Sequence, residues 1–197
     1  MEKMQHLLVQ FLERCGLQYE VSGKSAIRAL VSGEHGKWFW VAGGNEEDNL
    51  LVSLSICPVQ VPADRRAQVC EYINRANYGL RVGNFEMDFS DGEVRFRTTI
   101  PIVQDGEIHD EVQRQIFISF ATFDQYIPGV LGVAFGQLTP SQAIKLAEDD
   151  SHSAPFATPE SLLDDEDFWA ELNQEYQDEC DEPAGWYRRW NNEGHVN

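Results

Sequence analysis

The stretch NYGLRVGNFEMDFSDGEVRFRTTIPI, residues 77–102, contains an Asp-Gly dipeptide between two runs in which apolar and polar residues alternate. Asp91-Gly92 is typical of a two-residue β-hairpin turn, and the alternation is typical of strands with one buried face. With this turn, apolar side chains fall on one face, and two acids lie opposite arginines on the other. We therefore predict a β-hairpin in this register: Ser90–Glu93, Phe89–Val94, Asp88–Arg95, Met87–Phe96, Glu86–Arg97 and Phe85–Thr98.

Three acids near the turn, Asp88, Asp91 and Glu93, raise the alternative of a metal-binding loop. A calcium loop of the EF-hand type needs oxygen ligands at alternate positions and a glutamate at its twelfth position. Counted from Asp88, the twelfth position is Thr99, so the spacing does not fit. We interpret these acids as turn and strand residues, and we predict that none of them is a metal ligand.

Hydrophobic periodicity predicts the elements on either side of the hairpin. Apolar residues at spacings of three and four indicate helices, and short β-compatible runs between polar turns indicate strands. Thr139, Pro140 and Gln142 form a helix-start signal of the capping-box type. The predicted order is a helix at 3–15, strands at 25–32, 38–42 and 49–56, a helix at 65–77, the hairpin, and helices at 109–127 and 139–148. This order predicts an α+β fold, in which an antiparallel sheet has helices packed on one face.

The predicted helix at 109–127 is apolar over much of its circumference. A helix of this kind is buried on more than one side, so we predict that it forms the core or a contact between two subunits. Pro128 and Gly129 are predicted to kink or end it. The residues assigned to this core or dimer surface are Ile116, Phe117, Phe120, Phe123 and Ile127.

The aromatic run at 38–40 belongs to one of the predicted strands. Strand alternation places Trp38 and Trp40 on one face of the sheet and Phe39 on the other. We interpret these side chains as core or subunit-contact residues. A platform that stacks against a ligand is the alternative interpretation.

A family resemblance is carried by the residues around the hairpin. A helix that ends in INRANYGLRVGNFEMD, followed by DGEVRFRTTIPI and a long Phe-rich helix, resembles the bacterial YbjN-like family. The similarity covers roughly residues 5–147. It implies a fold similar to that of the type III secretion chaperones, a dimeric module with the order α-β-β-β-α-β-β-α. It also implies a regulatory or protein-binding role, and it supplies no catalytic residues that could be transferred to this chain.

Charge is distributed unevenly along the chain. The net charge is −18, and residues 148–197 hold nearly half of the 33 acids but only two bases, Arg188 and Arg189. This balance argues against binding to nucleic acid or to anionic membranes, because phosphate contacts require clustered Lys and Arg. No uninterrupted apolar run approaches the roughly 20 residues of a membrane span, and the N-terminus does not resemble a signal peptide. Four cysteines without a CxxC pair are typical of a reducing compartment, so we predict a cytoplasmic protein.

The chain is predicted to divide into an α+β domain at 1–148 and an acidic, partly disordered tail at 149–197. Thr158 and Pro159 are typical of a helix start, and we predict an amphipathic helix near 159–177. Its apolar edge is predicted to bind protein, either its own domain or a partner. The residues of this edge are Leu162, Leu163, Phe168, Trp169, Leu172 and Tyr176.

The sequence carries no recognisable motif of catalysis. There is no GxSxG or HExxH motif, and the histidines lack the spacing of metal ligands. We predict a non-enzymatic protein-binding module of chaperone-like or regulatory type that acts as a homodimer, without a cofactor and with a protein partner that the sequence does not identify. Two alternatives stay open: an acidic protein that binds calcium weakly through its C-terminal carboxylates, and an enzyme whose catalytic residues meet only in the fold.

Overall fold

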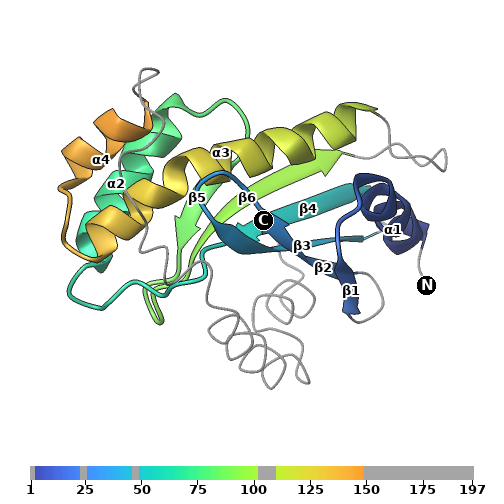
Figure 1. Ribbon diagram of the computed structural model, residues 1–197, viewed down its shortest axis with the longest axis horizontal. Coiled ribbons are helices and arrows are strands. Elements are labelled where there is room, and N and C mark those ends of the chain that lie inside the picture. The colour runs from blue at the N-terminus through green and yellow to red at the C-terminus, as the bar shows by residue number, and fades with distance from the viewer. Residues whose placement is uncertain (1–2, 23–25, 46–48, 102–109, 149–197) are drawn as a thin grey trace, which may run out of the picture. The chain divides into compact units, whose positions relative to one another are not determined.

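The computed structural model describes residues 3–22, 26–45, 49–101 and 110–148 (Figure 1). The predicted α+β class is confirmed. In chain order, the elements are α1 (Lys3–Cys15), β1 (Tyr19–Ser22), β2 (Ala26–Ser32), β3 (Lys37–Asn45), β4 (Leu50–Ile56), α2 (Arg66–Gly79), β5 (Asn84–Met87), β6 (Val94–Pro101), α3 (Asp110–Ala134) and α4 (Pro140–Ala147).

The strands form one antiparallel sheet in the order β1-β2-β3-β4-β6-β5. Helix α3 runs along the sheet and contacts β4 and β6, α1 packs on β2 and β3, and α2 and α4 pack against α3 (Figure 1). The edge strand β1 was not predicted, because three of its four residues are exposed and its sequence, YEVS, has little apolar character. The capping box at Thr139 is confirmed at the start of α4.

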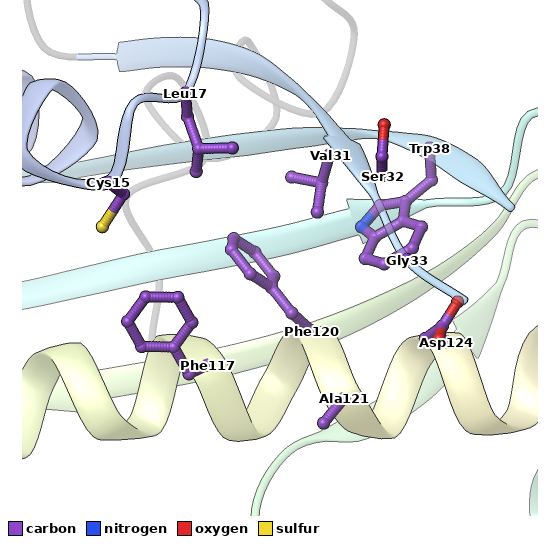
Figure 2. Close-up of a pocket in the computed structure, with 10 residues that line it drawn as sticks. All are labelled: Cys15, Leu17, Val31, Ser32, Gly33, Trp38, Phe117, Phe120, Ala121 and Asp124. Atoms are coloured by element: carbon purple, nitrogen blue, oxygen red, sulfur yellow. The ribbon is translucent and has the colours of Figure 1, made fainter. Parts of the chain in front are cut away.

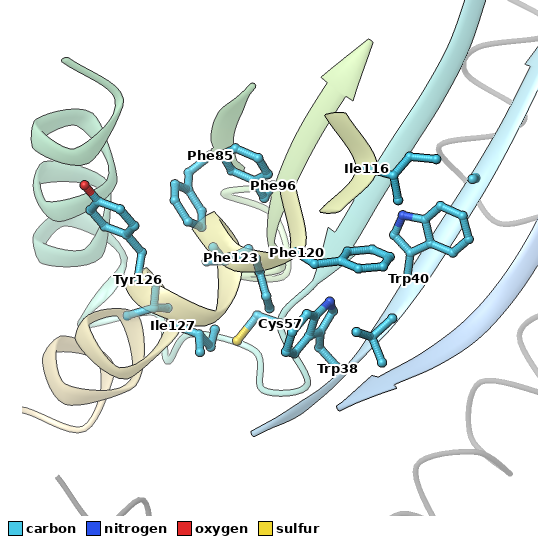
Figure 3. Close-up of a cluster of buried hydrophobic side chains, with 14 of the residues drawn as sticks. Trp38, Trp40, Cys57, Phe85, Phe96, Ile116, Phe120, Phe123, Tyr126 and Ile127 are labelled. Atoms are coloured by element: carbon cyan, nitrogen blue, oxygen red, sulfur yellow. The ribbon is translucent and has the colours of Figure 1, made fainter. Parts of the chain in front are cut away.

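The hydrophobic core lies between the sheet and the helices (Figure 3). Strand register brings Trp40, Ser55, Phe96 and Phe85 into one row on the helix-covered face. Aromatic rings from α3 fill the space above this row: Phe120 lies edge-on to Trp40, with ring centroids 5.4 Å apart, and Phe123 lies 6.2 Å from Phe85. The predicted alternation of the 38–40 run is therefore confirmed, with Trp38 and Trp40 in the core.

The opposite face of the sheet has an apolar centre and ion pairs toward its edges. Phe39 and Ile56 lie opposite each other there, as do Val41 and Leu54. Arg28 pairs with Glu20 at 2.7 Å on the β1 side. On the β5 side, the carboxylate of Glu86 pairs with both Arg95, at 2.9 Å, and Arg97, at 3.2 Å.

The sequence predicts a kink or an end at Pro128; helix α3 continues through Pro128 to Ala134, so it does not end there. The hydroxyl of Tyr72 on α2 donates to the carbonyl of Tyr126, 2.9 Å away, and so supports the backbone at the proline. By length and composition, residues 112–134 could cross a membrane, although the sequence prediction found no such stretch. More than half of an 18-residue window within this span is buried in the fold. Packing on the sheet accounts for the apolar character of the helix.

The β5–β6 hairpin exists, but its predicted register is wrong by two residues. Met87 lies opposite Val94, Glu86 opposite Arg95 and Phe85 opposite Phe96. The connection is a four-residue loop, because the amide of Asp88 donates to the carbonyl of Glu93 (2.9 Å) and the amide of Gly92 donates to the carbonyl of Asp88 (2.8 Å). A shift of two residues leaves each side chain on the same face, so facial sorting could not distinguish the two registers.

Asp91 has the predicted role in the turn, whereas Asp88, predicted to lie opposite Arg95 on the strand, belongs to the loop, and Glu86 lies opposite Arg95 instead. A carboxylate oxygen of Asp88 accepts from the amide of Ser90, and one of Asp91 accepts from the amide of Glu93, both at 2.8 Å. Arg66 at the start of α2 also donates to loop carbonyls, including that of Asp91 at 2.8 Å. The loop is therefore held by its own side chains and by a cation from a distant segment.

Candidate functional site

A pocket of about 380 Å³ opens on the helix-covered side of the sheet (Figure 2). Three segments that are distant in sequence form it: the end of α1 with the loop that follows, the β2–β3 hairpin, and the middle of α3. The lining residues are Cys15, Leu17, Val31, Ser32, Gly33, Trp38, Phe117, Phe120, Ala121 and Asp124.

Aromatic side chains make up much of the pocket wall. Phe120 lies edge-on to Trp38, with ring centroids 6.2 Å apart, and Phe117 lies edge-on to Phe120 at the same separation. Phe117 also packs edge-on against Phe11 of α1, at 5.7 Å. Edge-to-face geometry is a favoured arrangement for aromatic rings, so these contacts stabilise the wall.

One end of the pocket is held by Asp124. Its carboxylate accepts from the backbone amides of Glu34 (2.9 Å) and His35 (3.0 Å), and it lies 3.3 Å from Nδ1 of His35. These bonds tie the turn of the β2–β3 hairpin to α3. A glycine is required at position 33, where the hairpin turn approaches α3, because a Cβ there would collide with the carboxylate of Asp124 and the ring of Trp38.

The two tryptophans of β3 differ in how their indole N–H groups are satisfied. Nε1 of Trp40 donates to Oγ of Ser53 at 2.7 Å. Nε1 of Trp38 is buried and has no hydrogen-bond partner in the described part of the chain. In Figure 2, this nitrogen lies on the edge of the ring that is turned toward Val31 and Phe120. The ring of Trp38 lines the pocket, but its nitrogen is fully covered by neighbouring atoms and is not accessible from the pocket.

The geometry of the pocket suits binding better than reaction. Cys15 is the only thiol among the lining residues, and partial burial raises its pKa, so the thiolate that would act as a nucleophile is disfavoured. Cys15 and Asp124 lie at opposite ends of the pocket (Figure 2). Within the ranges that the structure describes, no group of three His, Cys, Asp or Glu residues is placed to hold a metal ion.

The predicted core or dimer residues of α3 fall into two groups. Ile116, Phe120, Phe123 and Ile127 are buried against the sheet and its neighbouring helices. Phe117 is 48% exposed at the rim of the pocket. A contact between two subunits on this helix stays a prediction.

The predicted protein-binding edge of the tail, the predicted domain division at residue 148 and the calcium alternative all depend on residues beyond the described ranges. The pocket itself was not predicted. Only the run at 38–40 pointed toward it, through the alternative of an aromatic platform for a ligand.

Comparison with known proteins supports the family resemblance. A family model for YbjN, described as "Putative bacterial sensory transduction regulator", matches residues 6–131. The crystal structure of YbjN from E. coli, described as "a putative transcription regulator", is similar with a TM-score of 0.49 and 11% identity, over 68% of this chain and 94% of that one. No curated protein matches the sequence. Because the family model covers well over half of its length, the chain belongs to the YbjN family.

Proposed function

We propose that the protein is a non-enzymatic regulatory module that acts by binding other proteins, and that two copies associate through the outer surface of α3. Family membership supports the regulatory role. The observation that carries the contact between copies is an exposed apolar pair on α3, Phe117 and Ile118, with 48% and 40% of their surface accessible.

The position of this pair favours a second copy of the chain as its partner. Phe117 and Ile118 are neighbours in sequence, and Phe117 continues into the aromatic wall of the pocket, so together they form a patch and not isolated apolar residues. A chain with a net charge of −18 repels a copy of itself unless the contact surface is uncharged. A twofold contact places the same patch on both subunits, and an apolar patch is complementary to itself.

Light scattering coupled to size-exclusion chromatography tests the contact. The wild-type chain is expected to have the mass of two copies, and a Phe117→Asp, Ile118→Asp double variant is expected to have the mass of one. Phe89→Asp is the matched control, because Phe89 is also about half exposed but lies in the β5–β6 loop. A wild-type monomer, or a double variant that keeps the dimer mass, contradicts this assignment of the contact.

We assign the binding of other proteins to the apolar edge of the acidic tail. The supporting observation is the sequence pattern, in which apolar residues recur at helical spacing among many carboxylates. A triple variant, Leu162→Ser, Trp169→Ser, Leu172→Ser, keeps the charge of the tail and removes three of the six apolar residues of this edge. Proteins cross-linked to the wild-type chain in its own cell are expected to be lost in the triple variant and kept in Phe89→Asp. Identical cross-linked proteins in the wild type and the triple variant count against the assignment.

A further inference from the structure

We infer that the outer face of the sheet, opposite the helices, binds the predicted acidic helix at 159–177 of the same chain through the apolar edge of that helix. The apolar centre of the outer face consists of Phe39, Val41, Val52, Leu54 and Ile56. The inference does not depend on the proposed dimer. It goes beyond the proposed protein-binding role of the tail, because an edge that is docked on the sheet is not available to another protein.

The first step concerns the burial of this apolar centre. Leu54 is 1% exposed and Ile56 is 3% exposed. The helical residues that pack on the sheet belong to the core cluster on its other face, and that cluster includes neither of these two residues. An antiparallel sheet can leave one face in water, but apolar side chains at the centre of such a face stay partly accessible. The burial of Leu54 and Ile56 therefore requires a further layer, which the described helices do not supply.

The second step concerns charge on the outer face. Its strand positions carry more bases than acids, although the chain as a whole has a net charge of −18. The bases are Arg28, Lys37, Arg95 and Arg97, and the acids are Glu20 and Glu86. Glu93 of the adjoining loop adds one more acid, 3.6 Å from Arg95. The outer face therefore keeps an excess of positive charge around its apolar centre.

The third step concerns the occupant. Residues 159–177 contain seven acids and no base, and the predicted apolar edge lies among these acids. An amphipathic helix of this composition matches both features of the outer face, since its apolar edge covers the apolar centre and its carboxylates approach the surrounding bases. A second copy of the outer face would bring bases against bases, so it is a poorer match.

The position of this segment in the chain favours its own sheet over a separate protein of the same chemistry. Glu148 is the last described residue, and residues 149–158 connect it to the predicted helix. A fully extended chain of that length spans up to about 33–36 Å, which exceeds the roughly 15 Å radius of gyration of a domain of this size. A short linker gives the attached segment an effective concentration on the order of millimolar.

Hydrogen–deuterium exchange of the purified full chain, followed by mass spectrometry, tests the docking. A helix with many like charges is unstable alone in water, so slow exchange of its amides requires packing of its apolar edge. The amides between Leu162 and Tyr176 are expected to exchange at least about 10-fold more slowly than those of an unstructured chain. Exchange at the unstructured rate in the wild type overturns the inference. Protection that falls on dilution indicates docking between copies and overturns the assignment to the same chain.

Two double variants with the same change in net charge locate the contact. Lys37→Glu, Thr99→Glu adds acids to the outer face at positions that are not buried, and Ser141→Glu, Lys145→Glu adds them at exposed positions of α4. The outer-face variant is expected to exchange at least about 5-fold faster between 162 and 176 than the wild type, and the α4 variant is expected to match the wild type. Unchanged protection in the outer-face variant, or equal loss in both variants, overturns the inference.

The docking and the proposed binding of other proteins can fail separately. Exchange in the purified chain reports docking without any partner, whereas cross-linking in the cell reports the partners themselves. Exchange of the amides of β2, β3 and β4, recorded in the same experiment, shows whether the outer-face variant is folded. If that variant does not fold, the exchange rate of residues 162–176 in the wild type still supports or overturns the inference.

Discussion

Substitution of Gly92 by alanine tests the structure of the hairpin loop. Gly92 has a φ of +91°, and a Cβ at this position would collide with the backbone of Val61. The positive φ costs an alanine about 1–2 kcal/mol, and the collision costs about 1–3 kcal/mol more if the backbone must move. Loss of the hydrogen bond from the Val61 amide to the Gly92 carbonyl, 2.9 Å long, adds about 1 kcal/mol. We therefore expect Gly92→Ala to lower the free energy of unfolding by about 3–6 kcal/mol.

Gly16→Ala separates the backbone cost from the collision. Gly16 follows α1 with a φ of +67°, and no atom lies within 4 Å of the position that its Cβ would take. This variant is expected to lose only about 1–2 kcal/mol. Both free energies are measured by urea unfolding with linear extrapolation. Equal losses in the two variants would refute the close packing of the loop on Val61.

Three further predictions address the core, a buried thiol and the tail. Phe120→Asp places a carboxylate among Trp38 and Trp40 and is expected to cost more than about 3 kcal/mol; an unchanged near-ultraviolet circular dichroism spectrum and melting temperature contradict it. Burial raises the pKa of the Cys57 thiol to about 12. The folded state therefore keeps this proton while the unfolded state releases it above about pH 9, so stability falls as pH rises from 9 toward 12, and Cys57→Ala should reduce that fall. Calorimetric titration with calcium is expected to show no micromolar binding to the full chain; such binding, if lost on deleting 148–197, favours the calcium alternative.

Most elements could be predicted from sequence because each has one strong local signal. The helix at Lys3–Cys15 has an apolar stripe, and α4 begins with a capping box whose hydrogen bonds are all present. Strand β1 lacks such a signal, because its stability comes from pairing with β2 and not from its own composition. Helix α3 passes Pro128 because tertiary packing on the sheet, α2 and α4 outweighs the local preference of a proline to end a helix.

The hairpin register shows a different limit of sequence reasoning. The Asp91-Gly92 dipeptide favours a two-residue turn, but Asp88 closes a four-residue loop through its side chain and backbone. Arg66 also donates to three loop carbonyls, those of Phe89, Ser90 and Asp91, and this contact joins residues more than 20 positions apart. Together these hydrogen bonds stabilise the four-residue loop by more than the preference of Asp91-Gly92 for a two-residue turn. The longer loop therefore forms.

Two residues beside the candidate site that the sequence presents as equivalent differ in the structure. Trp38 and Trp40 lie on the same face of β3, and each has a serine at the same diagonal position on β4: Ser53 for Trp40 and Ser55 for Trp38. Trp40 uses its serine, whereas the Trp38 nitrogen and the Ser55 hydroxyl are both buried without a partner in the described residues. The ring of Trp38 packs instead against Phe120 and Phe123 of α3. Periodicity predicts the face that a side chain occupies, but the direction of its polar edge follows from packing with α3, which only the folded structure reveals.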